Sequence, residues 1–261
     1  MAEVIAVAVP KGGSGKTTTT LNLGAALAER GVRVLCVDMD PQGNLTEALG
    51  IADKDITHTV YTAIHSFLQT YEPRLDLVIC PTSAGFDLAP TDVRLTLAEA
   101  ELTVAPTGPT IMQMLLAPLL NRYDVILLDT LPSLGVLVRN ALVAAQSVII
   151  PMQAEPLSAQ SVSLMLDQIQ FMRRSRLNPT LRVLGILFTM VDSRTNISRD
   201  VIEYAREAFG SQVPLFATTI PRSTRVPESQ ARYETILQYE QSGKVASAYR
   251  ALAEEVFGAT A

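Results

Sequence analysis

The 261-residue sequence has little of several features that would assign it to a class at once. Its two cysteines, Cys36 and Cys80, stand apart inside apolar runs, which predicts buried reduced thiols in strands rather than a clustered metal site. No apolar run approaches the roughly 18 residues that span a bilayer. The opening residues, MAEVIAVAVPKGG, carry an acid where a signal peptide carries basic residues. We therefore expect a cytoplasmic protein with no membrane segment.

An excess of positive charge is also absent. The 21 lysines and arginines face 26 acids, which gives a formal net charge of −5. Any contact with nucleic acid would therefore need a local basic patch, or one formed only in a dimer. Hydrophobic residues nevertheless make up 48% of the chain and charged residues 18%. That composition is sufficient for a buried core and is unlike that of a disordered chain.

What is present is an alternation of short β-branched runs with longer segments of helical period, such as Thr18–Arg30 and Ser158–Arg174. Nearly all the runs are apolar throughout, as strands buried on both faces of a parallel sheet should be. The pattern predicts an α/β fold, a doubly wound and mostly parallel sheet with helices on both faces, in a single domain over 1–261. Its ligand should lie at the carboxyl ends of the strands. The predicted strands are Val4–Val9, Val32–Val37, Leu75–Cys80, Val125–Leu128, Val148–Ile150 and Val183–Phe188.

The first strand leads into VAVPKGGSGKTTTT, a glycine-rich turn followed by a helix that begins at Lys16. Gly12, Gly13 and Gly15 let backbone amides converge on phosphate oxygens without obstruction by side chains. Lys16 can reach the terminal phosphates, Thr17 can offer its hydroxyl to Mg²⁺, and the helix N-terminus adds the positive end of its dipole. A glycine-rich turn without a ligand would not explain why strand, glycines, Lys-Thr and helix occur together.

Acidic residues follow two later strands. Asp38 and Asp40 stand two residues apart in DMDPQGNLT, and Asp129 ends the run DVILLD. Taken alone, the first segment is equally consistent with a plain turn, because Asp, Pro, Gly and Asn are all turn formers. Beside a phosphate loop, these carboxylates are the groups that Mg²⁺ and an attacking water need for hydrolysis.

The phosphate loop departs from the usual pattern, since Pro10 replaces its first glycine and a second lysine, Lys11, begins K-G-G-S-G-K-T. This loop resembles the deviant Walker A motif of the P-loop ATPase family that contains ParA/Soj, MinD, nitrogenase iron protein and the arsenite-pump ATPases. The resemblance implies that Lys11 crosses a nucleotide-sandwich dimer to the partner's phosphates. It also implies that Lys11, Lys16 and Asp40 are catalytic, with Asp40 positioning the water. The implied ligands of Mg²⁺ are Thr17, Asp38 and Asp129, and the implied nucleotide contacts are Lys11, Gly12, Gly13, Gly15, Lys16, Thr17 and Thr18.

Later segments resemble the ParA/Soj branch in particular: DVILLDTLPSLG, IIPMQAEPLSAQ, LGILFTMVDSRTNIS and IPRSTRVPES. On that resemblance Pro221 and Ser223 border the adenosine, and Arg194 and Arg225 bind DNA non-specifically. Arg194, Arg199, Arg222 and Arg225 lie in loop-like stretches, with Asp192 and Asp200 as the only acids immediately beside them. The chain departs from the branch at Thr130 and Leu131, which replace Cys and Pro, and again after Glu228.

Other members of the family fit less well. A membrane-bound, MinD-like chain should end in a basic amphipathic helix, whereas Val245, Tyr249, Leu252 and Val256 predict a core-facing stripe. An iron–sulphur reductase needs a cysteine after the strand of Asp129, and neither cysteine lies there. His58 and His65 fall in the least regular stretch, Gly50–Tyr71, and are interpreted as surface residues rather than catalytic ones.

The sequence therefore predicts an ATPase that uses ATP and Mg²⁺ to drive a DNA-partition switch. By resemblance, ATP favours a homodimer that coats double-stranded DNA non-specifically in the nucleoid. A DNA-bound ParB-type partner then triggers hydrolysis. Two alternatives remain at this point: a ParA-like ATPase that positions a protein cargo on the nucleoid, and a metabolic ATP-dependent ligase of the same fold.

Overall fold

The structure of the protein is a computed structural model that describes residues 1–51 and 57–260. Within these residues a single sheet of eight strands runs through the molecule in the order β3-β4-β2-β5-β1-β6-β7-β8. All neighbouring strands pair in parallel except β3 and β4. The strands are β1 (Glu3–Val7), β2 (Val34–Met39), β3 (Cys80–Pro81), β4 (Asp87–Ala89), β5 (Val125–Thr130), β6 (Ser147–Gln153), β7 (Arg182–Val191) and β8 (Leu215–Pro221).

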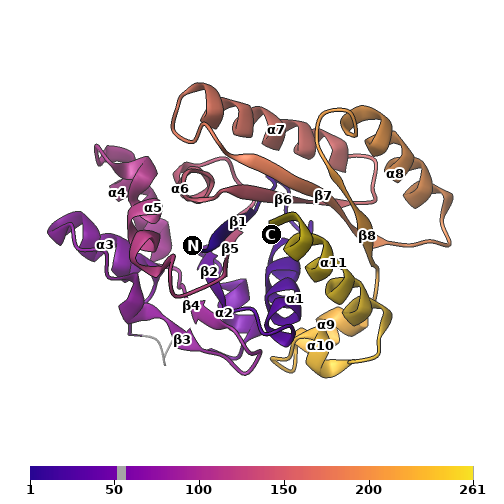
Figure 1. Cartoon of the computed structure of the whole chain (residues 1–261), viewed down its shortest axis with the longest axis horizontal. Helices are drawn as coiled ribbons and strands as arrows, with labels where there is room; N and C mark the ends of the chain where they lie inside the picture. The colour runs from indigo at the N-terminus through magenta and orange to yellow at the C-terminus, as the bar shows by residue number, and fades with distance from the viewer. Residues whose placement is uncertain (52–56, 261) are drawn as a thin grey trace.

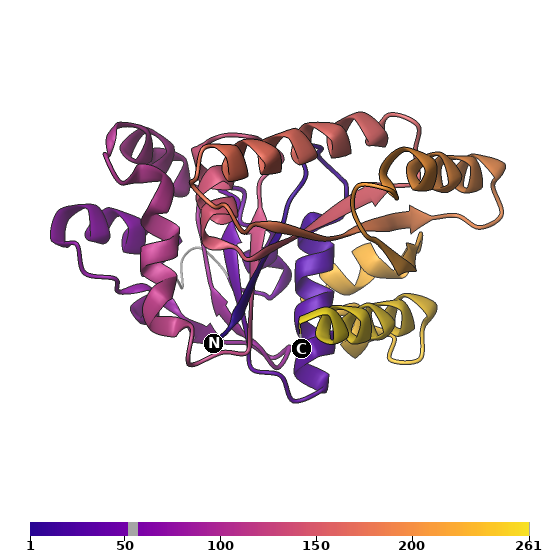
Figure 2. The same ribbon diagram turned by 45° about the horizontal axis from the view of Figure 1, so that its top comes forward.

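Helices cover both faces of this sheet, so the predicted doubly wound α/β fold is confirmed (Figures 1 and 2). One face carries α3 (Val60–Thr70), α4 (Leu95–Val104), α5 (Ile111–Leu116), α6 (Val136–Ala144), α7 (Ser158–Arg174) and α8 (Asn196–Phe209). The other carries α1 (Lys16–Glu29), α2 (Asn44–Ala48), α9 (Arg225–Gln230), α10 (Ile236–Tyr239) and α11 (Lys244–Thr260). Short 3₁₀ turns complete the described elements at η2 (Leu75–Val78), η3 (Gly108–Thr110) and η4 (Ala117–Leu119).

Each central strand contributes to two hydrophobic cores, because successive side chains of a strand point to opposite faces. In β1, Val4 and Ala6 face the core under α3–α8, and Ile5 faces the core under α1 and α11. Both sets are buried, which is why the strands read as continuous apolar runs rather than as an alternation.

The predicted strand Leu75–Cys80 is wrong for most of its length. Leu75–Val78 is a 3₁₀ turn, and only Cys80 and Pro81 pair with β4, in the antiparallel sense. Leu75 and Val78 are buried while Leu77 is 56% exposed. Apolar residues three apart on one buried side fit a 3₁₀ turn, in which positions i and i+3 align.

Two strands were missed, and others extend further than predicted. β4 has only three residues, and the edge strand β8 exposes or half-exposes most of its side chains, so neither forms a strongly apolar run. β2 continues through Asp38, and β5 through Asp129, so these acids lie within the strands rather than after them. Within Gly50–Tyr71, residues 52–56 lie outside the described part of the chain.

Three predictions for the helices and cysteines have clear outcomes. α1 begins at Lys16 and α7 spans Ser158–Arg174, both as predicted. The stripe on α11 is core, since Val245, Tyr249, Leu252 and Val256 are buried. Both cysteines are free thiols, but Cys80 is only half-buried whereas Cys36 is fully buried.

The last helix, α11, contacts the edge strand β8 of the sheet. The carboxylate of Glu255 on α11 accepts hydrogen bonds from the backbone amides of Ala217 at 2.9 Å and Thr218 at 2.8 Å in β8. These amides would otherwise be unpaired donors on an edge strand. Across residues 1–51 and 57–260, no helix combines the length and the apolar character that crossing a membrane requires.

Candidate nucleotide-binding site

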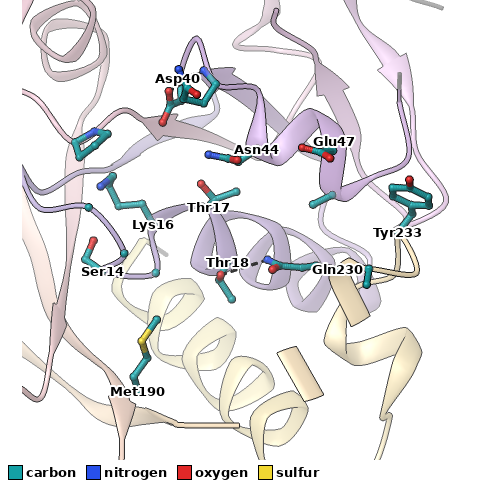
Figure 3. A pocket seen from close by; sticks show the side chains of 17 residues that line it. Ser14, Lys16, Thr17, Thr18, Asp40, Asn44, Glu47, Met190, Gln230 and Tyr233 are labelled. Atoms are coloured by element: carbon teal, nitrogen blue, oxygen red, sulfur yellow. Dashed lines mark hydrogen bonds between the residues drawn. The ribbon is translucent and has the colours of Figure 1, made fainter. Parts of the chain in front are cut away.

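A cavity of about 660 Å³ opens at the carboxyl ends of β1, β2 and β5. Figure 3 shows Lys16 and Thr17 at the start of α1, with Asp40, Asn44 and Glu47 on the wall across from them. The third side comes from α9 and the turn after it. The position of the cavity agrees with the ligand site predicted from the strand-helix alternation.

The phosphate loop connects β1 to α1. Gly13 and Gly15 have φ angles of 69° and 88°, a left-handed conformation that side chains disfavour, so these two glycines are needed for the shape of the loop. Lys16 is 6% exposed, and its ammonium group donates to the carbonyl of Lys11 at 2.9 Å. Burial lowers the pKa of Lys16, and the charges of Asp129 and Asp40 oppose that shift. The ammonium group of Lys16 is thereby held in the cavity, where it could neutralise the charge of a bound phosphate.

The loop is also held from outside by two neighbouring strands. Gln153 at the end of β6 donates its side-chain amide to the carbonyl of Gly13 at 2.7 Å. The hydroxyl of Thr189 in β7 donates to the carbonyl of Ser14 at 2.8 Å. Neither residue was predicted from the sequence to have a role, although both lie in segments that resemble the ParA/Soj branch.

Two carboxylates meet below the loop. Asp38 and Asp129 occupy paired positions on the adjacent strands β2 and β5, and neither side chain has measurable exposure. Burial raises the pKa of both carboxyls, and the charge of Asp38 raises that of Asp129 further. Asp129 accepts a hydrogen bond from Thr20 at 3.1 Å through Oδ1, while its buried Oδ2 has no partner among the described residues.

This arrangement fits a divalent cation. The unpartnered Oδ2 of Asp129 and the hydroxyl-bearing Thr17 are hard oxygen donors, which Mg²⁺ prefers. Positive charge there would also offset the repulsion between Asp38 and Asp129. Asp38 is less available, because its Oδ2 already accepts from the amide of Thr46 at 2.9 Å and from the hydroxyl of Thr46 at 2.7 Å.

Asp40 differs from Asp38 in facing the cavity. It is 6% exposed, lines the cavity wall, and accepts a hydrogen bond from the amide of Gln42 at 3.0 Å. Its own amide donates to Asp38 at 3.2 Å. Asp38 and Thr46 therefore hold the turn that carries Asp40, and the second carboxylate oxygen of Asp40 is left to act on a molecule in the cavity.

Lys11 has a different orientation from Lys16. Its ammonium group contacts Ser158 Oγ at 2.9 Å and Glu155 Oε2 at 3.4 Å, and the other carboxylate oxygen of Glu155 lies 3.5 Å from Arg222. Of the two lysines in the loop, only Lys16 lines the cavity as the described residues define it. The chain therefore holds Lys11 at the rim of the site.

Comparisons with known proteins agree with this geometry. A family model described as an AAA domain matches residues 2–183. The chain is 43% identical over 253 residues to the chromosome-partitioning ATPase Soj of Thermus thermophilus, a match that covers 97% of this chain and 94% of that protein. It is 38% identical over 256 residues to the sporulation initiation inhibitor protein Soj of Bacillus subtilis, a match that covers 98% of each.

The chain belongs to the ParA/Soj family of P-loop ATPases. A solved structure described as cobyrinic acid a,c-diamide synthase from Mycobacterium smegmatis, with bound ATP analogue and magnesium, superimposes with a TM-score of 0.85. It is 37% identical to this chain, and the match covers 97% of this chain and 93% of that one. The resemblance drawn from the sequence motifs is therefore confirmed at the level of family and fold.

A second, smaller cavity of about 240 Å³ adjoins the phosphate site of this ParA/Soj-family chain. It includes Pro221 and Ser223, the residues expected beside adenosine, and it shares Gly15, Thr18 and Met190 with the larger cavity. A ligand that extends past Met190 would thus reach from the phosphate loop into the smaller cavity.

The two arginines expected to bind DNA lie on the surface and are both ion-paired. Arg194 is 87% exposed and pairs with Asp192 at 2.8 Å, and its hydrogen bonds lower the pKa of Asp192 to about 2. Arg225 pairs with Glu228 at 2.8 Å and with Glu240 at 3.8 Å. The expectation that Arg225 lies in a loop without acidic partners is wrong, because it begins α9 and Glu228 is three residues further along that helix.

Proposed function

We propose that this ParA/Soj-family ATPase is a DNA-partition switch. In this proposal Mg·ATP drives a homodimer that binds double-stranded DNA non-specifically in the nucleoid. A DNA-bound ParB-type partner then stimulates hydrolysis and release. The names of the relatives support it, since two of them are chromosome partitioning proteins called ParA, from Myxococcus xanthus and Caulobacter vibrioides, at 39% and 37% identity.

The orientation of Lys11 is the observation that supports dimerisation. Its ammonium group is bonded at the rim by Glu155 and Ser158, while Lys16 occupies the cavity. The Lys11 side chain is 24% exposed, so it can exchange these partners for phosphate oxygens of a second copy. Lys11 does not line the cavity of its own chain. It is therefore suited to contact the phosphates bound to a second copy across an interface, as an arginine finger does.

The remaining residues of the cavity supply binding and water activation. The loop amides, the start of α1 and Lys16 hold the phosphates of ATP. Thr17 and Asp129 would hold Mg²⁺, with Asp38 acting through water, and the cation would neutralise charge on the terminal phosphates. Asp40 faces the same space and orients the attacking water. Pro221 and Ser223 border the adenosine in the smaller cavity.

Arg194 and Arg225 are the proposed DNA contacts. Both are exposed and on the surface, and phosphate contacts need only such cations without a helix that reads bases. Their acidic partners and the net charge of −5 disfavour binding by a single copy. A dimer doubles the number of arginines along one duplex, so DNA binding should depend on ATP.

Fluorescence anisotropy with two labelled duplexes of unrelated sequence tests the proposal directly. Measured with ATP, with ADP and without nucleotide, binding should appear only with ATP and should be equal for the two sequences. Binding should also weaken steeply as salt rises, because phosphate contacts release counterions. Binding that is indifferent to nucleotide, or no binding with ATP, would overturn the partition function.

Two alternatives have separate tests. A ParA-like ATPase that positions a protein cargo on the nucleoid would give the same DNA-binding result, and a neighbouring gene for a DNA-binding partner separates it from a partition ATPase. An ATP-dependent ligase is a candidate because of the name of the M. smegmatis structure. A ligase would release ADP in the presence of cobyrinic acid and ammonia and would be insensitive to duplex DNA.

A further inference from the structure

We propose that Gln153 and Thr189 are positioning residues for the phosphate loop, which keep two consecutive carbonyls out of the nucleotide cavity. The inference rests on nucleotide binding at this loop, which is part of the proposed function, and concerns how the loop is held ready for a phosphate. Gln153 lines neither cavity, and Thr189 borders only the smaller one. Both act through the backbone of Gly13 and Ser14.

The two side chains are paired by the sheet itself. Gln153 and Thr189 are register partners on the parallel strands β6 and β7, and both are at least nine-tenths buried. Gln153 Nε2 donates to Gly13 O at 2.7 Å, and Thr189 Oγ1 donates to Ser14 O at 2.8 Å. Adjacent strand positions thus bind adjacent carbonyls of the loop.

The loop also lies close against these two residues. A Cβ atom built on Gly15 would meet Thr189 Cγ2 at 3.6 Å, and one built on Gly13 would meet Gln153 Nε2 at 4.0 Å. The two glycines therefore present their open sides to the strands. The same loop residues line the larger cavity, and Gly15 and Thr189 also border the smaller one.

The strand that carries Thr189 becomes irregular just after that residue. The next residue, Met190, has a φ angle of 52°, which is uncommon for a residue with a side chain, and the pairing of β7 with β8 shifts register between Phe188 and Val191. Met190 Sδ lies 3.3 Å from Gln153 Nε2, so that amide contacts both the loop and the irregular strand end. Sparsely populated backbone conformations of this kind cluster at functional sites.

The physical consequence is pre-organisation of the peptide planes. A loop that contains Gly12, Gly13 and Gly15 has unusual rotational freedom, and each peptide plane carries its amide and carbonyl on opposite sides. A carbonyl turned inward would bring a partial negative charge against a phosphate and remove an amide donor from it. Hydrogen bonds from Gln153 and Thr189 hold those carbonyls on the strand side, so less ordering remains to be done when nucleotide binds.

The test compares Thr189→Val, which removes only the hydroxyl, with Thr189→Ser, which keeps it. Calorimetry should show that Thr189→Val binds Mg·ADP about fivefold more weakly, the effect expected when one hydrogen bond is removed, while Thr189→Ser stays close to the parental affinity. Thr82→Val is the matched control, because the Thr82 hydroxyl donates to the carbonyl of Phe86 in the β3–β4 hairpin, away from the cavity. It should bind Mg·ADP normally.

A purely structural hydrogen bond would give a different result. In that case Thr189→Val would lower the unfolding midpoint of the nucleotide-free protein and leave the Kd for Mg·ADP of the folded protein unchanged. That outcome would overturn the inference, and so would equal weakening by valine and serine. Gln153→Met, which keeps length without a donor, should weaken binding similarly, and the double variant should weaken it more than either single change. Failure of the parental protein to bind Mg·ADP would instead remove the proposed function.

Discussion

Asp38 and Asp129 are partners in the register of two neighbouring parallel strands, and both carboxylates are completely buried. Burial raises the pKa of each, and the two acids are close enough to disfavour a second negative charge. Two buried carboxylates in adjacent strands destabilise the fold unless a cation lies beside them. Lys16 supplies part of that charge, and Mg²⁺ is the proposed source of the rest.

Replacing Asp129 tests this interpretation. Asp129→Asn removes the unpartnered acceptor with little change in size, so it should leave the unfolding free energy of the nucleotide-free protein within about 1 kcal/mol of the parental value. The additional rise in unfolding midpoint that Mg²⁺ gives to the ADP-bound protein should disappear. Asp124→Asn, just before the other end of β5, serves as the control and should keep that rise. A full magnesium effect in Asp129→Asn would contradict the assignment.

Asp40→Ala should bind ATP and fail to hydrolyse it. The carboxylate faces the cavity, whereas the proposed phosphate contacts come from the loop and Lys16, so affinity and turnover should separate. Gel filtration with ATP should then show an accumulated dimer. Asp40→Asn, which keeps the size of the side chain, should behave in the same way. Hydrolysis at the parental rate in either variant would remove Asp40 from the mechanism.

Lys11→Ala should bind ATP nearly as well as the parental protein and remain monomeric on gel filtration, because Lys11 lies at the rim of its own site. Glu155→Gln gives the opposite test, since it removes the charged partner that holds Lys11 in the single chain. It should dimerise with ATP at a lower protein concentration, by less than about fivefold, because a partly exposed ion pair contributes at most about 1 kcal/mol. A dimer formed by Lys11→Ala with ATP would exclude the crossing role.

Arg194→Ala and Arg225→Ala should each weaken ATP-dependent DNA binding equally for unrelated sequences, with unchanged ATP affinity. The slope of log K against log salt should fall by about 0.9 for each arginine that no longer neutralises a DNA phosphate. Arg33→Ala provides a matched control, since Arg33 is also an exposed arginine in an ion pair, with Asp124 at 2.6 Å. Normal DNA binding by both variants would place the DNA surface elsewhere.

The sequence could predict those parts of the site whose residues lie close together along the chain. The phosphate loop follows a recognisable apolar strand, and Asp38 and Asp129 lie near the ends of two others. The structure brings these strand ends together at one edge of the sheet, where the loop and Asp40 line the cavity. Gln153 and Thr189 reach the loop from 140 and 175 residues away along the chain. Their contribution depends on sheet order, which no local pattern encodes.

The errors in the fold have a similar physical origin. Leu75 and Val78 are apolar enough for a strand, but their burial on one side reflects packing that only the folded chain determines. The acidic partners of Arg225 were missed for a related reason. Glu228 faces it only because α9 is a helix, and Glu240 lies beyond the next short helix.

The contact of Glu255 with Ala217 and Thr218 also bears on how copies of this chain can associate. A carboxylate seated on the free amides of β8 blocks the place where a strand from another molecule would add, and the opposite edge, β3, is only two residues long. Continuous sheet growth between molecules is thereby disfavoured at both ends. Removal of the last turns of α11, which include Glu255, should therefore make the protein aggregate through β8, even with the nucleotide cavity intact.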